Sequence, residues 1–111
     1  ARTLVDQIYI DDQIANYIVE LIQTTRTPTV VSEELSEFVE NGASPRATLA
    51  LTLCAKANAF LDGRGYVTPQ DVKDLAHDVL RHRIATTYEA EAEGKTSDDV
   101  IAALLDYVPV P

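Results

Sequence analysis

The chain has 111 residues and a formal net charge of −9 at pH 7, with 46% hydrophobic and 24% charged residues. This length is typical of one small domain, and the composition is that of a globular protein, which excludes a disordered chain. The nine Lys and Arg residues are scattered singly except at Arg81 and Arg83. A nucleic-acid surface needs a clustered basic face, so the charge pattern argues against that class of partner.

Membrane insertion and disulfide bonding are also disfavoured. No apolar run approaches the roughly 18 residues needed to span a bilayer, and the first three residues do not begin a signal peptide. The single Cys54 has no second cysteine to pair with, which favours a cytoplasmic protein. We expect Cys54 to be a small buried side chain within an apolar helical pattern. The absence of methionine, even at position 1, predicts an excised piece of a longer polypeptide.

Two helices are predicted in the first part of the chain. Asp11 or Asp12 caps the first helix, which carries a stripe of apolar residues and runs to about Thr25. A short second helix is predicted over residues 33–40, because Ser32 is a good cap and acidic residues favour a first turn.

The most apolar segment predicts a helix from Pro45 to about Leu61. Between residues 47 and 61 only four polar side chains interrupt the apolar ones, and they do not form a continuous polar face. A helix that is apolar nearly all round is normally covered by its neighbours, so we expect a central helix with Leu53 fully buried. Gly63 then supplies the left-handed residue that ends such a helix.

The C-terminal half predicts two further main helices. Thr68 and Pro69 form a cap followed by a proline, and apolar residues at helical spacing continue to Leu80. The last helix is capped by Thr96 or Ser97, with its apolar residues directed inward.

The segment between these helices is ambiguous, because its alternation has period two while its alanines and glutamates favour helix. We expect a short extended piece at Ile84–Ala85, pairing with Tyr66–Val67, and then a brief helix that ends at Gly94. The whole pattern therefore predicts an all-α fold of four main helices with short connections and at most a minimal two-stranded β-bridge.

The sequence lacks the parts that hydrolyse a nucleotide. It contains no G-x-x-x-x-G-K-[ST] loop to hold phosphates, and no apolar strand-like run ends in paired acids that could hold Mg²⁺. His77 and His82 do not lie one helical turn apart, so we predict no metal site. A thiol catalyst built on Cys54 lacks any local signature.

The run of residues 42–47, Gly-Ala-Ser-Pro-Arg-Ala, is the strongest indication of function. Ser44 is a good N-cap, and Pro45 suits the first helical position because its missing N–H costs nothing there. Arg46 follows in the first turn, where the helix already carries partial positive charge. A guanidinium at that position becomes favourable if a phosphate binds at the same helix end.

This run closely resembles the sensor-2 motif of the MoxR family of AAA+ ATPases, where GASPRA begins a helix of the small helical lid subdomain. Further stretches are similar to the same family in the same order along the chain. They are residues 9–12, 63–72, 80–84, 88–94 and 108–111. The resemblance implies that residues 1–111 form the AAA+ C-terminal helical lid domain, with the sensor-2 motif at 42–47.

The resemblance also implies roles for individual residues. Arg46 is expected to contact the γ-phosphate of ATP in the assembled ATPase and is the candidate catalytic residue. Ser44 and Pro45 shape the helix start beside it and are the other candidate cofactor-binding residues, although as a local pattern they form a cap and a first turn. ATP and Mg²⁺ would be bound mainly by the core domain of the parent protein.

The implied partners are that core domain, sister subunits of a ring, and proteins with von Willebrand A domains. A phosphate-binding loop should then be encoded roughly 200 residues before Arg46, an expectation from the family. The alternative is a stand-alone helical module that binds a partner helix through an apolar groove, without nucleotide chemistry. A helix-turn-helix reader of DNA is disfavoured by the net charge of −9.

Other charged residues have structural interpretations. Arg64 follows a helix end, where a cation satisfies C-terminal carbonyl groups. Arg81, His82 and Arg83 form the only basic cluster, which either pairs with Asp78 or Glu89 or contacts another domain or subunit. The acidic residues 89, 91 and 93 are interpreted as a solvated face.

Overall fold

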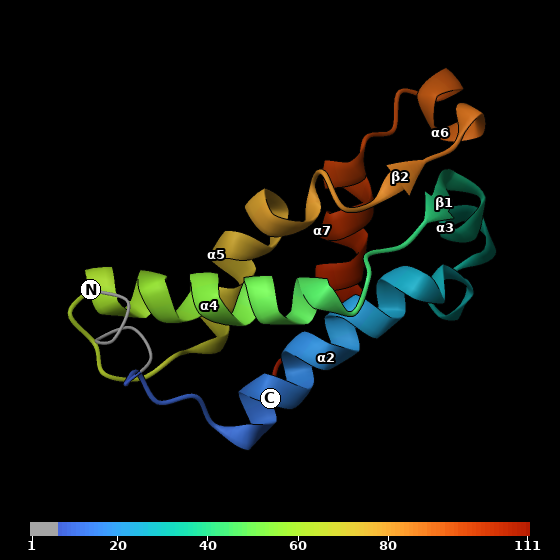
Figure 1. The fold of residues 1–111 in the computed structure, drawn as a ribbon. Coiled ribbons are helices and arrows are strands. Elements are labelled where there is room, and N and C mark those ends of the chain that lie inside the picture. Colours follow the sequence, from blue (N-terminus) through green and yellow to red (C-terminus); the bar gives the residue numbers. More distant parts are fainter. Residues whose placement is uncertain (1–6) are drawn as a thin grey trace.

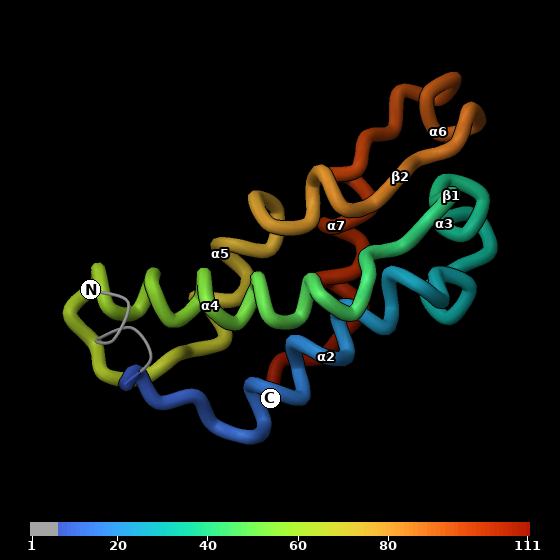
Figure 2. The backbone as a smooth tube through the Cα atoms, in the orientation of Figure 1, coloured from blue at the N-terminus to red at the C-terminus, as the bar shows by residue number. Residues whose placement is uncertain are grey.

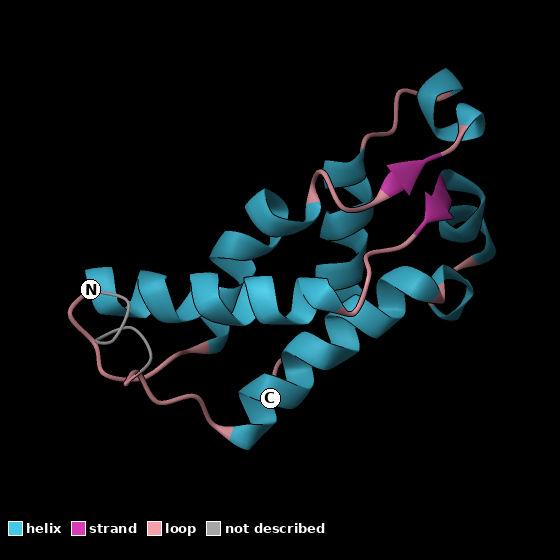
Figure 3. Ribbon diagram, in the orientation of Figure 1, coloured by secondary structure: helices cyan, strands magenta, loops and turns pink. Residues whose placement is uncertain are grey.

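A computed structural model describes residues 7–111 of the chain (Figure 1). This part of the chain contains six α-helices, one 3₁₀ turn at Pro28–Val30 and a two-stranded sheet, so the predicted all-α class is confirmed (Figure 3). Within it, no helix combines the length and the apolar character needed to cross a membrane. The helices are α2 (Asp12–Arg26), α3 (Glu33–Phe38), α4 (Arg46–Leu61), α5 (Pro69–Leu80), α6 (Tyr88–Ala92) and α7 (Ser97–Tyr107).

The four long helices, α2, α4, α5 and α7, form the body of the molecule, as the sequence predicts. Figure 1 shows α4 lying across α5 and α7, while α2 runs obliquely beneath the N-terminal half of α4. The short helices α3 and α6 gather with both strands at one end of this body (Figure 2). Buried residues form two adjoining core clusters, and all four long helices contribute to them.

The starts of α2, α3, α5 and α7 follow capping residues that the sequence predicts. The Asp11 carboxylate accepts a hydrogen bond from the Gln13 amide at 2.9 Å, and the Ser32 hydroxyl accepts one from the Leu35 amide at 3.0 Å. Capping boxes begin α5 at Thr68 and α7 at Thr96. These caps satisfy amide groups that a helix leaves unpaired, which explains why the boundaries follow the local sequence.

The end of α4 is equally local. Gly63 has φ +77°, and its amide donates to the Phe60 carbonyl at 3.0 Å. The Arg64 amide donates to the Ala59 carbonyl at 2.9 Å. This is the Schellman arrangement, which favours glycine at the left-handed position, and it confirms the predicted helix end.

The small sheet differs from the prediction. Strand β1 (Val39–Asn41) pairs antiparallel with β2 (Ala85–Thr86), so the predicted pairing of Ile84–Ala85 with Tyr66–Val67 is wrong. Tyr66 instead forms an isolated parallel bridge with Tyr9. The extended piece is held beside α3 because the Thr87 hydroxyl and amide donate to carbonyl groups at the end of that helix, at 2.6 and 3.0 Å.

The central helix α4 is covered on one side only. Ala47, Leu51, Ala55 and Ala59 recur every four residues and are fully buried. Leu53 and Cys54 are only partly buried, so the predicted full burial of Leu53 and the predicted burial of Cys54 are wrong. On the open side Leu49 is 65% exposed. The apolar pattern around the whole helix therefore exceeds what the described part of the chain covers.

Candidate functional site

The loop that leads into α4 lies tightly against the end of α2. The Ala43 amide donates to the Thr25 hydroxyl at 3.0 Å, and that hydroxyl donates to the Ile22 carbonyl at 2.6 Å. Both Thr25 and Ala43 are buried. A Cβ atom on Gly42 would come within 2.3 Å of the Thr25 carbonyl oxygen, so the loop approaches α2 too closely for any side chain there.

At the start of α4 the backbone conformation is as the sequence predicts, but the Ser44 side chain is not. Pro45 has helical φ and ψ, and the Ser44 carbonyl accepts from the Ala47 amide at 2.9 Å. The predicted cap by the Ser44 hydroxyl is wrong, because the start of α4 has no side-chain cap hydrogen bond. The loop is held through its backbone amide at Ala43, which leaves the Ser44 side chain exposed to solvent.

Arg46 is exposed and is the first residue of α4. Among the described residues it forms no ion pair, so the structure does not provide an acidic partner for it. Immediately before it, Arg26, Glu40 and the loop residues 41–45 line a surface hollow. The result is an exposed guanidinium at a helix N-terminus, beside a hollow that the loop backbone forms.

Arg64 is structural, as the sequence suggests, but its partner differs from the prediction. The guanidinium donates to both carboxylate oxygens of Asp71 at 2.6 and 2.7 Å, and not to the carbonyl groups at the end of α4. Hydrogen bonding by Arg64 holds the pKa of the buried Asp71 well below its usual range, and further bonds come from Thr68 and Asn58. The pair fixes the loop between α4 and α5, and it occupies Arg64 fully.

The basic cluster at the end of α5 is partly explained by ion pairs. Arg81 lies 3.4 Å from Asp78, as predicted, and 3.0 Å from Asp98 on α7, which the sequence did not indicate. The hydrogen bond with His77 and the bonds from Arg81 lower the pKa of Asp98. His82 and Arg83 are exposed, and no ion pair with Glu89 is present among the described residues.

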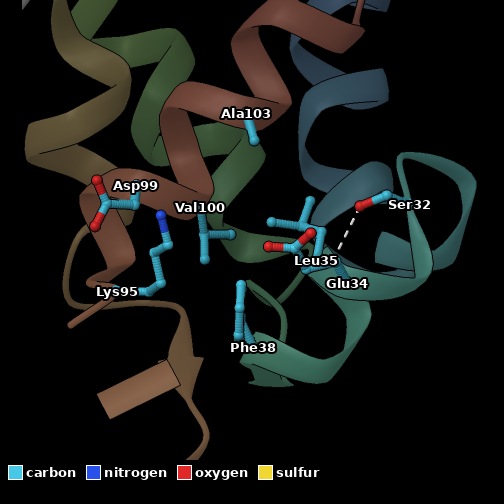
Figure 4. A pocket seen from close by; sticks show the side chains of 8 residues that line it. All are labelled: Ser32, Glu34, Leu35, Phe38, Lys95, Asp99, Val100 and Ala103. Carbon is cyan, nitrogen blue, oxygen red and sulfur yellow. Dashed lines mark hydrogen bonds between the residues drawn. The ribbon is translucent and has the colours of Figure 1, made fainter. Parts of the chain in front are cut away.

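A separate cavity of about 260 Å³ lies between α3 and α7 (Figure 4). Leu35, Phe38 and Val100 form its apolar floor, with Lys95 and Asp99 at the rim. None of the residues from 42 to 46 lines it. This depression is therefore distinct from the helix start that carries Arg46. In the described chain no group of three His, Cys, Asp or Glu side chains is arranged to hold a metal ion.

Comparisons with known proteins point to one family. Residues 32–104 match the model of the AAA lid domain, and this range includes the candidate site at residues 42–46. Chaperone MoxR1 of Mycobacterium tuberculosis is 36% identical over 104 residues, which are 93% of this chain and 28% of that protein. The uncharacterized protein YeaC of Bacillus subtilis is 36% identical over 107 residues, covering 96% of this chain and 31% of its own length.

A solved structure agrees with these relatives. A crystal structure of a protein from Cytophaga hutchinsonii that is assigned as an ATPase superposes with a TM-score of 0.92 at 38% sequence identity. The match covers 98% of this chain and 33% of that one, so the chain spans only about a third or less of each protein it resembles. The order of the helices, the GASPRA start of α4 and these matches agree: the chain belongs to the AAA lid domain family, in the form carried by MoxR-type AAA+ ATPases.

Proposed function

We propose that this chain is the lid of an ATP-hydrolysing MoxR-type ATPase and that Arg46 contacts the γ-phosphate of bound ATP. The observation that carries the proposal is the placement of Arg46, an exposed guanidinium at the first residue of α4 that no described acid neutralises. A helix N-terminus and a guanidinium both favour an anion, and a phosphate fits their combined donors.

Ser44 and Pro45 would flank the phosphate contact. Both are exposed and line the hollow that precedes Arg46. The Ser44 hydroxyl is not used to cap α4, so it is available to a ligand oxygen. Pro45 contributes no donor, and its part is to start the helix at the residue before Arg46.

The lid alone does not supply the rest of a nucleotide site. The sequence has no phosphate-binding glycine loop, so ATP and Mg²⁺ would be held mainly by the core domain of the complete protein. In that protein the nucleotide would lie between core and lid, and sister subunits would form a ring in the cytoplasm. A chaperone role with partners that carry von Willebrand A domains is part of the same proposal.

Substitution of Arg46 in the complete protein that carries this lid tests the proposal. Arg46→Ala should lower ATP turnover by about 10²–10³, the scale for losing one preorganised donor to developing charge. Arg46→Lys should restore only part of it, because an ammonium does not reproduce the two-donor fork of a guanidinium. Lys73→Ala, which removes a positive charge from α5, serves as the control. Unchanged turnover in Arg46→Ala would show that the residue is not a nucleotide contact.

A stand-alone interaction module remains the second candidate. It is favoured by the open side of α4, where Leu49 is 65% and Leu61 83% exposed. An apolar helix face of this kind binds partner helices in many proteins. The reading frame that encodes the chain discriminates the two functions, since only the ATPase needs a Gly-Lys-Ser/Thr loop roughly 200 residues before Arg46.

A further inference from the structure

We infer that Thr25 is a positioning residue for Arg46: it clamps the loop of residues 42–45 to the end of α2 and so fixes where α4 begins. The inference rests on the proposed function, because it explains how the lid holds Arg46 at one place. Thr25 lies near the end of a different helix and is separated from Arg46 by the whole α3–β1 segment. It would not itself touch the nucleotide.

The clamp has two hydrogen bonds that share one hydroxyl group. The Thr25 hydroxyl donates its only proton to the Ile22 carbonyl at 2.6 Å, which directs a lone pair at the Ala43 amide, 3.0 Å away. Thr25 is 1% exposed and Ala43 is fully buried, so water cannot replace this bond. The Ala43 amide therefore depends on Thr25 as its partner.

Gly42 allows the loop of residues 42–45 to lie close to the end of α2. Its backbone passes the Thr25 peptide so closely that a Cβ atom would meet the Thr25 carbonyl oxygen at 2.3 Å and the Arg26 Cα at 2.8 Å. Gly42 does not have a positive φ, so glycine is required here for the close approach and not for an unusual backbone conformation. A larger residue would push the loop away from α2.

The clamp acts on Arg46 over a short length of chain. Ala43 and Ala47 are both fully buried, and the exposed residues 44–46 form the three-residue span between them. Arg46 is thus held between two fixed alanines, one anchored by the Thr25 hydroxyl and one by packing in the core. A displacement of about 1 Å at a reacting centre can cost a hundredfold in rate, so this anchoring is relevant to turnover.

A double-substitution experiment in the complete protein tests the inference. Thr25→Val keeps the shape of the side chain and removes the hydroxyl, and it should lower kcat about tenfold with little change in KM. The double variant Thr25→Val/Arg46→Ala should turn over within about twofold of Arg46→Ala alone, because a displaced Arg46 has already lost its effect. Thr25→Ser keeps the hydroxyl and should stay within about twofold of the unchanged protein.

Thr24→Val is the matched control. Thr24 is the preceding residue, is also buried, and donates only to the Glu20 carbonyl of its own helix at 2.7 Å. Its substitution removes one hydroxyl from α2 without touching the loop, so turnover should not change. A fall in turnover equal to that of Thr25→Val would mean that general weakening of α2 explains the effect, and the inference would be wrong.

The possible outcomes separate the inference from the proposed function. Normal turnover in Thr25→Val beside an impaired Arg46→Ala overturns the inference alone, as do losses that multiply in the double variant. Full turnover in Arg46→Ala removes the proposed function and the inference with it. If Thr25→Val does not fold, Gly42→Ala displaces the same loop by steric pressure and should give the same non-additive loss with Arg46→Ala. Unfolding of both variants would make the clamp purely structural and would overturn the inference.

Discussion

At the scale of single residues, the arginines of this lid differ in what occupies them. Arg64 forms ion pairs with Asp71 and Asp62, and its guanidinium carbon lies 5.9 Å from the centre of the Tyr66 ring. Arg46 has no such partners among the described residues, although it begins α4 and Arg64 lies just beyond the end of the same helix. The two arginines differ because only Arg64 lies next to a buried carboxylate. A buried carboxylate needs a charged partner, and Arg64 is the partner of Asp71.

Asp71→Asn should therefore destabilise the chain, lowering its melting temperature by roughly 5–15 °C, since a domain of this size loses about 4–8 °C per kcal/mol. The amide can no longer accept two charged hydrogen bonds from Arg64. Asp74→Asn is the control, because Asp74 is exposed on the same helix and accepts only from Gln70 at 2.8 Å. Thermal unfolding followed by circular dichroism measures both, and equal melting temperatures would contradict the prediction.

The same carboxylate gives a pH dependence with a definite sign. Its pKa is lower in the folded chain than in the unfolded one, near 3.9, so the ion pair contributes stability above pH about 4 and loses it as the pH falls below that value. Asp71→Asn should flatten the fall in stability below pH about 4. Denaturant unfolding at a series of acidic pH values follows this slope, and an unchanged slope would show that other acids cause it.

At the scale of elements, what the sequence predicts well is local. The helix caps at Thr68 and Thr96 and the Schellman end at Gly63 each need partners only a few residues away, and all three are confirmed. The clamp between Thr25 and Ala43 joins residues 18 apart, and no periodicity in the sequence encodes it. The predicted strand pairing is wrong for the same reason. The partner of the extended piece at Ala85 is distant in the sequence, and the sequence pattern does not distinguish one short extended segment from another as that partner.

The burial of α4 was overpredicted for a different reason. The apolar periodicity of α4 indicates that its surface is unfavourable in water, but it does not indicate which chain or domain covers that surface. Leu51 lies on the stripe that this chain buries, whereas Leu53 lies two residues on and is half-buried. The same argument applies to Cys54, which lines a depression between α4 and α5.

Leu51→Ala and Leu53→Ala should accordingly differ in cost. Leu51 is fully buried, and its truncation should lower the free energy of unfolding by about 2–5 kcal/mol. Leu53→Ala in the same chain should cost less, about 1 kcal/mol, because part of its side chain is already in water. The midpoints of denaturant unfolding compare them directly. Equal losses would mean that the two sides of α4 are equally covered.

At the scale of the whole molecule, the proposed function gives this acidic chain one arginine, Arg46, with which to contact a nucleotide. Each charge-assisted hydrogen bond is worth about 1.5–3 kcal/mol. Even the two bonds of a guanidinium fork stay below the 4.1 kcal/mol that corresponds to a Kd of about 1 mM, because binding also costs about 4 kcal/mol or more in lost translational and rotational freedom. The 111-residue chain also lacks a phosphate-binding glycine loop, and its net charge of −9 opposes an anionic ligand.

The 111-residue chain by itself should therefore show no ATP hydrolysis and no saturable binding of ATP·Mg²⁺ below about 1 mM. Isothermal titration calorimetry with the unchanged chain and with Arg46→Ala should give indistinguishable, near-zero heats, since one exposed contact cannot offset the entropy lost on binding. The comparison controls for heats of dilution, which both proteins share. Binding with a Kd in the low micromolar range that is lost in Arg46→Ala would mean that the lid alone contains a complete nucleotide site. That result would contradict the proposal that the core domain binds most of the nucleotide.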